Sequence, residues 1–193
     1  MGIDKVNKAI FLDRDGVINK LVFNKLLNEF EPPHNIKELI LFDWTLGCLK
    51  RFQENEYLLF IVSNQPDYAK GKTSLENLFS VHIELNRIFE LNKLYFKEYY
   101  YCYHHPEGII PEYSIKCDCR KPSNKNVLDA INKYSIDVKN SWFIGDRESD
   151  IICGKNSGLK TIFINENKII NKLADFNVEN LKEAAVIILQ FKN

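Results

Sequence analysis

Residues 9–16 have the sequence AIFLDRDG, an apolar run that ends in two carboxylates and a glycine. Its first five residues fit a buried strand, because short apolar runs bounded by a polar turn are typical of strands covered on both faces. Similar runs occupy residues 57–63 (YLLFIVS) and 142–145 (WFIG). Amphipathic segments with helical spacing separate these runs. Strands that alternate with helices predict an α/β fold, a Rossmann-like parallel sheet with helices on both faces.

The remaining elements follow from the same two periodicities. Further strands are predicted at residues 98–102 and 161–164. Helices are predicted at residues 39–55, from a capping box at residues 73–76, after a cap at Ser123, and at residues 149–157 and 179–191. No repeat, linker or low-complexity tract divides the chain. One domain over residues 1–193 is therefore expected.

Composition excludes several classes of protein. The chain has 193 residues, of which 45% are hydrophobic, and its 26 basic and 26 acidic side chains give a formal net charge of zero. A nucleic-acid surface needs an excess of Lys and Arg, no apolar run has the length of a membrane span, and the N-terminal residues carry charges where a signal peptide is apolar. We expect a cytoplasmic protein with neither nucleic acid nor membrane as a partner. The oligomeric state cannot be inferred from the sequence.

Polar side chains follow the predicted strands, and the carboxyl ends of parallel strands meet at one edge of a sheet. Asp13 and Asp15 follow the first strand, and Ser63 ends the second. The segment GDRESD at residues 145–150 follows a later strand, and Lys121 precedes a helix. The Asp-Gly pair alone would fit an ordinary turn. Together, carboxylates for a hard divalent cation with a hydroxyl and a lysine for oxyanions form a phosphoryl-transfer set.

Four segments resemble, in order, the four motifs of the haloacid dehalogenase (HAD) superfamily of phosphatases: FLDRDG at 11–16, VSNQ at 62–65, CRKP at 119–122 and GDRESD at 145–150. The resemblance covers nearly the whole chain. It implies a magnesium-dependent phosphomonoesterase that acts on a small phosphorylated metabolite through an aspartyl phosphate. Asp13 would be the nucleophile, and Asp15 would protonate the leaving oxygen and then deprotonate water.

The resemblance also implies which side chains bind. Ser63 and Lys121 would hold the transferred phosphoryl group. Asp13, the carbonyl of Asp15 and Asp146 would bind the catalytic Mg²⁺, and Asp150 would orient the waters of the metal. Substrate contacts are expected from Arg14, Ser63, Asn64, Asp67, Arg120, Lys121 and Arg147.

Three of the five cysteines lie close to two histidines in the sequence. Soft thiolates with an imidazole select zinc, and four protein ligands indicate a structural site. The predicted Zn²⁺ ligands are Cys102, His104, Cys117 and Cys119, with His105 as the alternative to His104. The competing interpretations are ordinary free cysteines and a zinc-ribbon nucleic-acid module, and the neutral charge disfavours the latter.

Within the superfamily, the zinc loop at residues 102–119 resembles that of the D-glycero-D-manno-heptose 1,7-bisphosphate phosphatases and the related histidinol-phosphate phosphatases. This resemblance implies a HAD fold without a large cap domain, in which the loop forms a wall of the substrate pocket and brings Arg120 to the substrate. The spacing CxHHPEG…CDCRKP is more similar to the heptose enzymes. A role in sugar, heptose or surface-glycan biosynthesis is expected.

Two segments depart from the heptose enzymes: residues 65–71 (QPDYAKG) and the longer stretch at residues 21–35 (LVFNKLLNEFEPPHN). Asp67 with Glu29 or Glu31 would make an acidic rim at the leaving group, which favours an amine-bearing phosphate such as histidinol phosphate over a bisphosphate. The alternative is that these acids face solvent. A binding protein that keeps the fold without the chemistry is the hypothesis from a different class.

Overall fold

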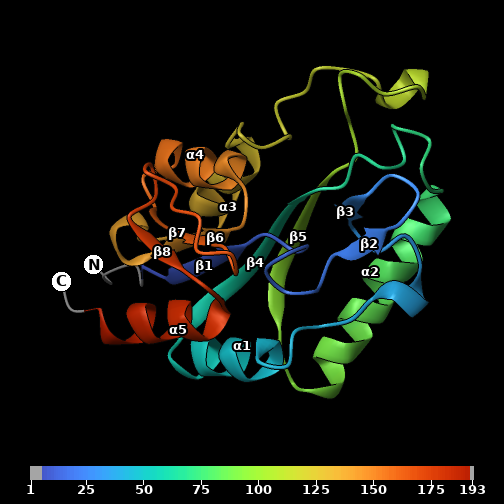
Figure 1. Cartoon of the computed structure of the whole chain (residues 1–193). Coiled ribbons are helices and arrows are strands. Elements are labelled where there is room, and N and C mark those ends of the chain that lie inside the picture. The colour runs from blue at the N-terminus through green and yellow to red at the C-terminus, as the bar shows by residue number, and fades with distance from the viewer. Residues whose placement is uncertain (1–5, 192–193) are drawn as a thin grey trace.

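The computed structural model describes residues 6–191 and shows one six-stranded, wholly parallel sheet with helices on both faces (Figure 1). The order of the strands is β5-β4-β1-β6-β7-β8. The strands are β1 (Lys8–Leu12), β4 (Tyr57–Asn64), β5 (Phe96–Cys102), β6 (Trp142–Gly145), β7 (Lys160–Ile164) and β8 (Phe176–Val178). Because β1 lies between β4 and β6, the motifs that follow these three strands start side by side. The predicted fold class is confirmed.

Two apolar layers hold the sheet between its helices. The helices are α1 (Thr45–Glu54), α2 (Leu75–Leu91), α3 (Lys125–Lys133), α4 (Glu148–Asn156) and α5 (Leu181–Gln190). One core packs Leu49, Leu85 and Ala184 of α1, α2 and α5 against the sheet. The other packs Val127 and Cys153 of α3 and α4 against the opposite face. None of the helices between residues 6 and 191 is both long and apolar enough to cross a membrane.

The predicted helix boundaries need three corrections. The helix expected from residue 39 begins at Thr45, because Leu41 pairs with Asn19 in an isolated bridge and keeps that stretch extended. Ser74, one residue after the predicted cap, accepts the backbone N–H of Asn77 at the start of α2. Ser123 does not cap α3, since its hydroxyl donates to the carbonyl of Asp118.

Several short elements were not predicted. The antiparallel hairpin of β2 (Val22–Asn24) and β3 (Glu29–Glu31) follows the first motif and belongs to a separate sheet. Edge strand β8 was missed too, as were the 3₁₀ turns η1 (Ile36–Glu38), η2 (Pro111–Tyr113) and η3 (Val138–Asn140). The hairpin matters for function because Pro32, which follows β3, lines a recess together with Asp13 and Lys121.

Candidate active site

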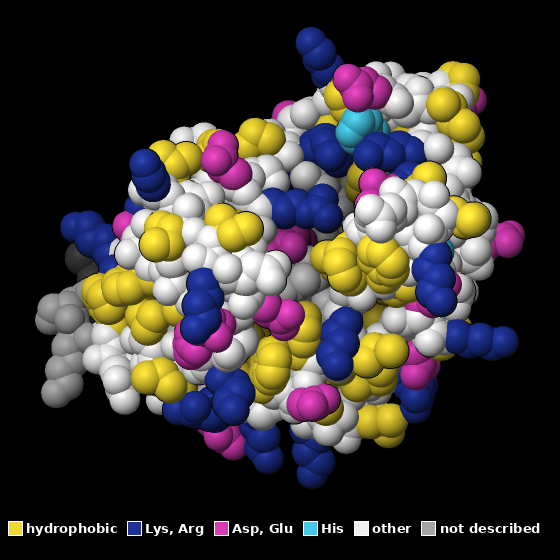
Figure 2. Space-filling view, viewed as in Figure 1, with side chains coloured by type: hydrophobic (Ala, Val, Ile, Leu, Met, Phe, Trp, Pro, Cys, Tyr) yellow, Lys and Arg dark blue, Asp and Glu magenta, His cyan; other side chains and the backbone are white. Residues whose placement is uncertain are grey.

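A cluster of three carboxylates, two buried and one half-buried, lies at the carboxyl edge of the sheet. Asp13 directly follows β1, Asp146 directly follows β6, and Asp150 lies in the first turn of α4. One oxygen atom of each carboxylate lies within 4.8 Å of the other two. Figure 2 shows a hollow near the centre of the molecule with basic and acidic side chains around it. We name Asp13, Asp146 and Asp150 the carboxylate cluster.

Two glycines allow the turns to approach so closely. Gly16 has a φ of +85°, and a Cβ atom there would lie 2.3 Å from Oδ2 of Asp146. A Cβ atom on Gly145 would lie 2.1 Å from the Cβ of Asp150. Any other residue at these two positions would displace the carboxylates, so the glycines of the first and fourth motifs have a steric role.

Lys121 neutralises part of the carboxylate cluster. Its Nζ lies 3.0 Å from Oδ1 of Asp13 and 2.7 Å from Oδ1 of Asp150, and it donates to the carbonyl of Val62 at 2.6 Å. Burial lowers the pKa of this ammonium, but the two carboxylates outweigh burial and raise it. The amide of Asn64 exchanges two hydrogen bonds of 3.0 Å with the backbone of Lys121 and so fixes the lysine loop.

The pKa shifts of the three members of the carboxylate cluster differ in direction. Burial raises the pKa of Asp13, yet the charge of Lys121 and a hydrogen bond from Ser63 outweigh burial and hold that pKa below its ordinary value. Burial and the charges of Asp13 and Asp150 raise the pKa of Asp146 well above its ordinary value. Burial raises the pKa of Asp150 to about 6. Crowded carboxylates of this kind are stabilised by a bound cation.

Asp15 points away from the carboxylate cluster. Its two oxygens accept from Nε and Nη2 of Arg14 at 3.1 and 3.0 Å. Oδ1 also accepts from Asn19 at 2.9 Å, and Oδ2 from Nε2 of Gln65 at 2.5 Å. Nε2 of Gln65 lies 3.0 Å from the hydroxyl of Ser63 as well. These bonds fix the orientation of the carboxyl group that was predicted to be the acid and base.

The structure gives three side chains roles that the sequence did not predict: Asn19, Gln65 and Arg14. Asn19 and Gln65 were not predicted site residues, although Gln65 ends the second quoted motif. Arg14 was predicted to contact substrate. Its side chain is 1% exposed and bonds to Asp15 and to Oε1 of Gln65. Arg14 therefore holds the carboxylate of Asp15 in place through these hydrogen bonds.

The acids of the predicted rim, Asp67, Glu29 and Glu31, form ion pairs with basic side chains. Oδ2 of Asp67 lies 2.8 Å from Nε2 of His34, and Nζ of Lys72 pairs with Glu31 and, at 2.9 Å, with Glu29. Each of the three acids therefore has a basic partner. Basic residues distant in sequence fold against these acids and offset much of their charge, although Glu29 and Glu31 share the single Lys72.

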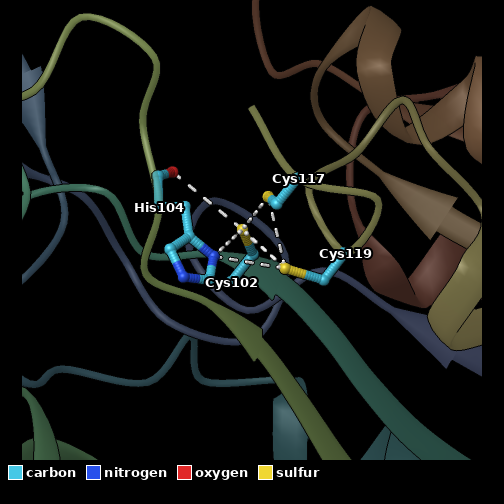
Figure 3. A group of neighbouring side chains, drawn as sticks. All are labelled: Cys102, His104, Cys117 and Cys119. Atoms are coloured by element: carbon cyan, nitrogen blue, oxygen red, sulfur yellow. Dashed lines mark hydrogen bonds between the residues drawn. The ribbon is translucent and has the colours of Figure 1, made fainter. Parts of the chain in front are cut away.

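The four predicted zinc ligands lie together (Figure 3). The Sγ–Sγ distances are 3.5 Å for Cys102–Cys117, 3.2 Å for Cys102–Cys119 and 3.4 Å for Cys117–Cys119. Nδ1 of His104 lies 3.5 Å from Sγ of Cys119. His105 instead accepts the backbone N–H of Glu107. The geometry thus selects His104 over His105, and we name these four residues the thiolate cluster.

Two arginines flank the catalytic residues. Arg120 follows the thiolate cluster directly, and its Nη1 donates to the carbonyl of His104 at 3.3 Å. Arg147 is the N-cap residue of α4 and lines the small recess beside Asp13 and Lys121. Arg120 and Lys121 therefore follow the thiolate cluster on one short segment.

Comparisons with known proteins agree with this arrangement. A family model described as HAD-hydrolase-like matches residues 118–184. The chain is 36% identical over 182 residues to the D-glycero-alpha-D-manno-heptose-1,7-bisphosphate 7-phosphatase of Campylobacter jejuni, covering 91% of this chain and 92% of the relative. It is 31% identical over 189 residues to the D-glycero-beta-D-manno-heptose-1,7-bisphosphate 7-phosphatase of Vibrio cholerae, covering 95% and 97%.

Solved structures show the same fold. The D,D-heptose 1,7-bisphosphate phosphatase from B. bronchiseptica, complexed with magnesium and phosphate, has a TM-score of 0.76 at 21% identity, covering 95% of this chain and 98% of that one. Sheet, site and relatives together define a HAD-like phosphatase, and the chain belongs to the D-glycero-D-manno-heptose-1,7-bisphosphate 7-phosphatase family.

Proposed function

We propose that the protein removes the 7-phosphate from D-glycero-D-manno-heptose 1,7-bisphosphate in a magnesium-dependent reaction. The observation that carries this proposal, in a chain of this family, is that two aspartates close in sequence have different bonding partners. Asp13, a member of the carboxylate cluster, pairs with Lys121. Asp15 instead bonds to Arg14, Gln65 and Asn19. We assign to Asp13 the attack on phosphorus and to Asp15 the transfer of protons.

In the first step, a carboxylate oxygen of Asp13 attacks phosphorus while the bond from phosphorus to the sugar oxygen breaks. Asp15 gives its proton to the departing oxygen, so that the sugar leaves as an alcohol. The low pKa of Asp13 keeps the nucleophile ionised. Lys121 and Ser63 hold the phosphoryl oxygens, where positioning and charge neutralisation provide most of the catalysis.

In the second step, Asp15 takes a proton from water and the resulting hydroxide attacks phosphorus. The bond from phosphorus to the Asp13 oxygen breaks, inorganic phosphate leaves, and Asp13 returns as a carboxylate. The same group thus serves first as acid and then as base. The bonds from Arg14 and Gln65 keep Asp15 in one orientation through both steps.

The carboxylate cluster fits a magnesium ion. Oδ1 of Asp146 is buried without a hydrogen-bond partner, as expected of an oxygen that binds a cation. Asp13, Asp146 and the carbonyl of Asp15 would hold the ion, with Asp150 beside it. Bound Mg²⁺ would neutralise charge on the transferred phosphoryl group.

The thiolate cluster fits a structural zinc ion. A tetrahedral zinc with Zn–S bonds of about 2.3 Å separates its sulfurs by about 3.8 Å, so the closest pair, at 3.2 Å, needs to move apart by about 0.6 Å. The ion would fix the loop that carries Arg120 and Lys121, and four protein ligands leave no coordination position for substrate.

The second phosphate of a bisphosphate would lie near Arg147, which lines the recess beside Asp13 and Lys121, and Arg120 is a further candidate because it precedes Lys121. Pairing of Asp67, Glu29 and Glu31 with His34 and Lys72 weakens the charge argument for an amine-bearing substrate. Between the two anomers we propose the α form, because the α-specific relative is the more similar of the two over nearly equal lengths.

The test is phosphate release from each anomer with Mg²⁺, followed by phosphorus NMR to identify the phosphate that remains. We expect the heptose 1-phosphate as the product and a kcat/KM at least about tenfold higher for the α anomer. A preference for the β anomer would contradict the anomer assignment alone. Faster release from histidinol phosphate would contradict the substrate class.

A further inference from the structure

The side chain that orients Asp15 is itself held by an aromatic ring. The guanidinium carbon of Arg14 lies 5.6 Å from the centre of the Tyr101 ring. Burial lowers the pKa of Arg14, but the charge of Asp15 and the hydrogen bonding of Tyr101 outweigh burial and raise it. The side chain of Arg14 is 1% exposed. Tyr101 is therefore a third protein group, after Asp15 and Gln65, that holds this guanidinium.

Tyr101 reaches Arg14 from the end of β5, the strand at the edge of the sheet. In the parallel register of the sheet, Tyr101 pairs with Ser63 of β4, and the hydroxyl of Ser63 lies 3.0 Å from Nε2 of Gln65. The carboxyl end of β5 thus lies directly beside the second motif. A residue of this edge strand can therefore act on the groups around Asp15.

His82 of α2 fixes the phenol of Tyr101 from the other side, since α2 lies alongside β5 (Figure 1). Its Nδ1 lies 3.3 Å from the hydroxyl oxygen of Tyr101, and the two rings meet edge to face with centroids 5.3 Å apart. Burial and the charge of Arg14 lower the pKa of His82. A neutral imidazole can accept the proton of the hydroxyl at Nδ1, which leaves the oxygen of Tyr101 to accept from Arg14.

We propose that Tyr101 and His82 are positioning residues that orient Asp15 through Arg14. The hydroxyl of Tyr101 donates to His82 and accepts from the guanidinium, which in turn donates to both oxygens of Asp15. We name Tyr101 and His82 the aromatic support. This inference rests on the proposed function, because it assigns the support a role in the proton transfers of Asp15.

Loss of the aromatic support should slow one step of the reaction selectively. A guanidinium that can turn carries the carboxylate of Asp15 with it, whereas Asp13 is held by its separate bond to Lys121. A displacement of about 1 Å can cost about a hundredfold in rate. Attack on p-nitrophenyl phosphate needs no proton from Asp15, because p-nitrophenolate leaves without one. Hydrolysis of the aspartyl phosphate does need Asp15 as a base.

The experiment follows one turnover of p-nitrophenyl phosphate with the enzyme in excess and Mg²⁺ present. Release of p-nitrophenolate reports the first step, and release of inorganic phosphate reports the second. For Tyr101→Leu we expect a first step within about twofold of the wild type and a second step slower by about tenfold to a hundredfold. Tyr101→Phe keeps the ring beside Arg14 and should lose less.

His82 provides a matched pair of variants outside the thiolate cluster. His82→Leu removes the acceptor and should slow the second step by about threefold, in line with the loss of one hydrogen bond. His82→Gln offers an amide oxygen to the phenol and should restore most of that rate. Tyr99→Phe is the control, because it removes a hydroxyl of the same strand that bonds to Asn86. Zinc content is measured in each Tyr101 variant, since the next residue belongs to the thiolate cluster.

Equal slowing of both steps by Tyr101→Leu, or no slowing of either, would overturn the proposal, as would equal rates for His82→Leu and His82→Gln. A second readout does not depend on activity. The Nε–H of Arg14, which donates to Asp15, should exchange with water faster in Tyr101→Leu than in the wild type or Tyr99→Phe, as measured by NMR. If the wild type releases no p-nitrophenolate with Mg²⁺, the proposed function fails, and unchanged exchange of this proton would then overturn the aromatic support.

Discussion

The carboxylate cluster and the thiolate cluster both bring together groups that bind metals, yet they differ in position and chemistry. Carboxylates at the ends of β1 and β6 are carried by the central strands of the sheet, and they are hard ligands suited to Mg²⁺. Three thiolates and His104 lie largely on a partly exposed loop and are soft ligands suited to Zn²⁺. The sheet thus provides the reacting groups, whereas the loop holds Arg120 and Lys121 against them.

The largest effect is expected inside the carboxylate cluster. Asp13→Asn preserves shape but removes the charge and the nucleophile, so kcat should fall by several orders of magnitude. Steady-state phosphate release measures this loss. The exposed Asp129→Asn is the control and should keep wild-type kcat. Near-normal turnover by Asp13→Asn would exclude Asp13 as the nucleophile.

A chelator should affect the two clusters differently. EDTA should abolish activity within minutes by removing Mg²⁺, and added Mg²⁺ should restore it. Zinc bound by four protein ligands should remain through the same treatment, at about one ion per chain by elemental analysis. Protein purified without chelators that contains no zinc would refute the structural role of the thiolate cluster.

Damage to the thiolate cluster should affect stability more than chemistry. Cys117→Ser weakens zinc binding and loosens the loop, so we expect Tm to fall by about 5–10 °C and kcat by less than about tenfold. Calorimetry and phosphate release measure the two effects. Cys48→Ser, which changes a buried thiol outside the cluster, tests whether the loss is specific to zinc; its zinc content should remain that of the wild type. A Cys117→Ser variant with unchanged Tm would contradict this role.

The two clusters could be predicted from the sequence because their members lie at strand ends or in short-range motifs. Asp13 and Asp146 follow buried strands, and Cys117 and Cys119 are two residues apart. The β2–β3 hairpin could not be predicted in this way. Its strands have three residues each, and the turn between them lacks the usual Gly or Pro.

Long-range partners explain the remaining errors. His34 and Asp67 are 33 positions apart, and no local pattern indicates that they pair. The acids near the site were therefore taken as free charge. In the same way, the pairing of Leu41 with Asn19 overrides the helical spacing that starts at residue 39, because tertiary contacts outweigh weak local preferences.

The smallest predicted effect concerns pH and the His34–Asp67 pair. Asp67 raises the pKa of His34 in the folded protein. The resulting stability is fully present below the unfolded pKa of His and is lost as pH rises through the folded pKa. The wild type should therefore exceed His34→Gln in unfolding free energy by up to about 1 kcal/mol at pH 6, and the difference should shrink by pH 9. A difference that grows with pH would contradict the ion pair.

The central claim is that Asp13 carries the phosphoryl group and Asp15 moves the protons. Asp15→Asn should form the aspartyl phosphate with a leaving group that needs no protonation, such as p-nitrophenolate, but should hydrolyse it slowly. Borohydride reduction of this protein during reaction with p-nitrophenyl phosphate and Mg²⁺ should convert Asp13 to homoserine, as detected by peptide mass spectrometry. Reduction at Asp146 or Asp150, or at no aspartate, would contradict the account.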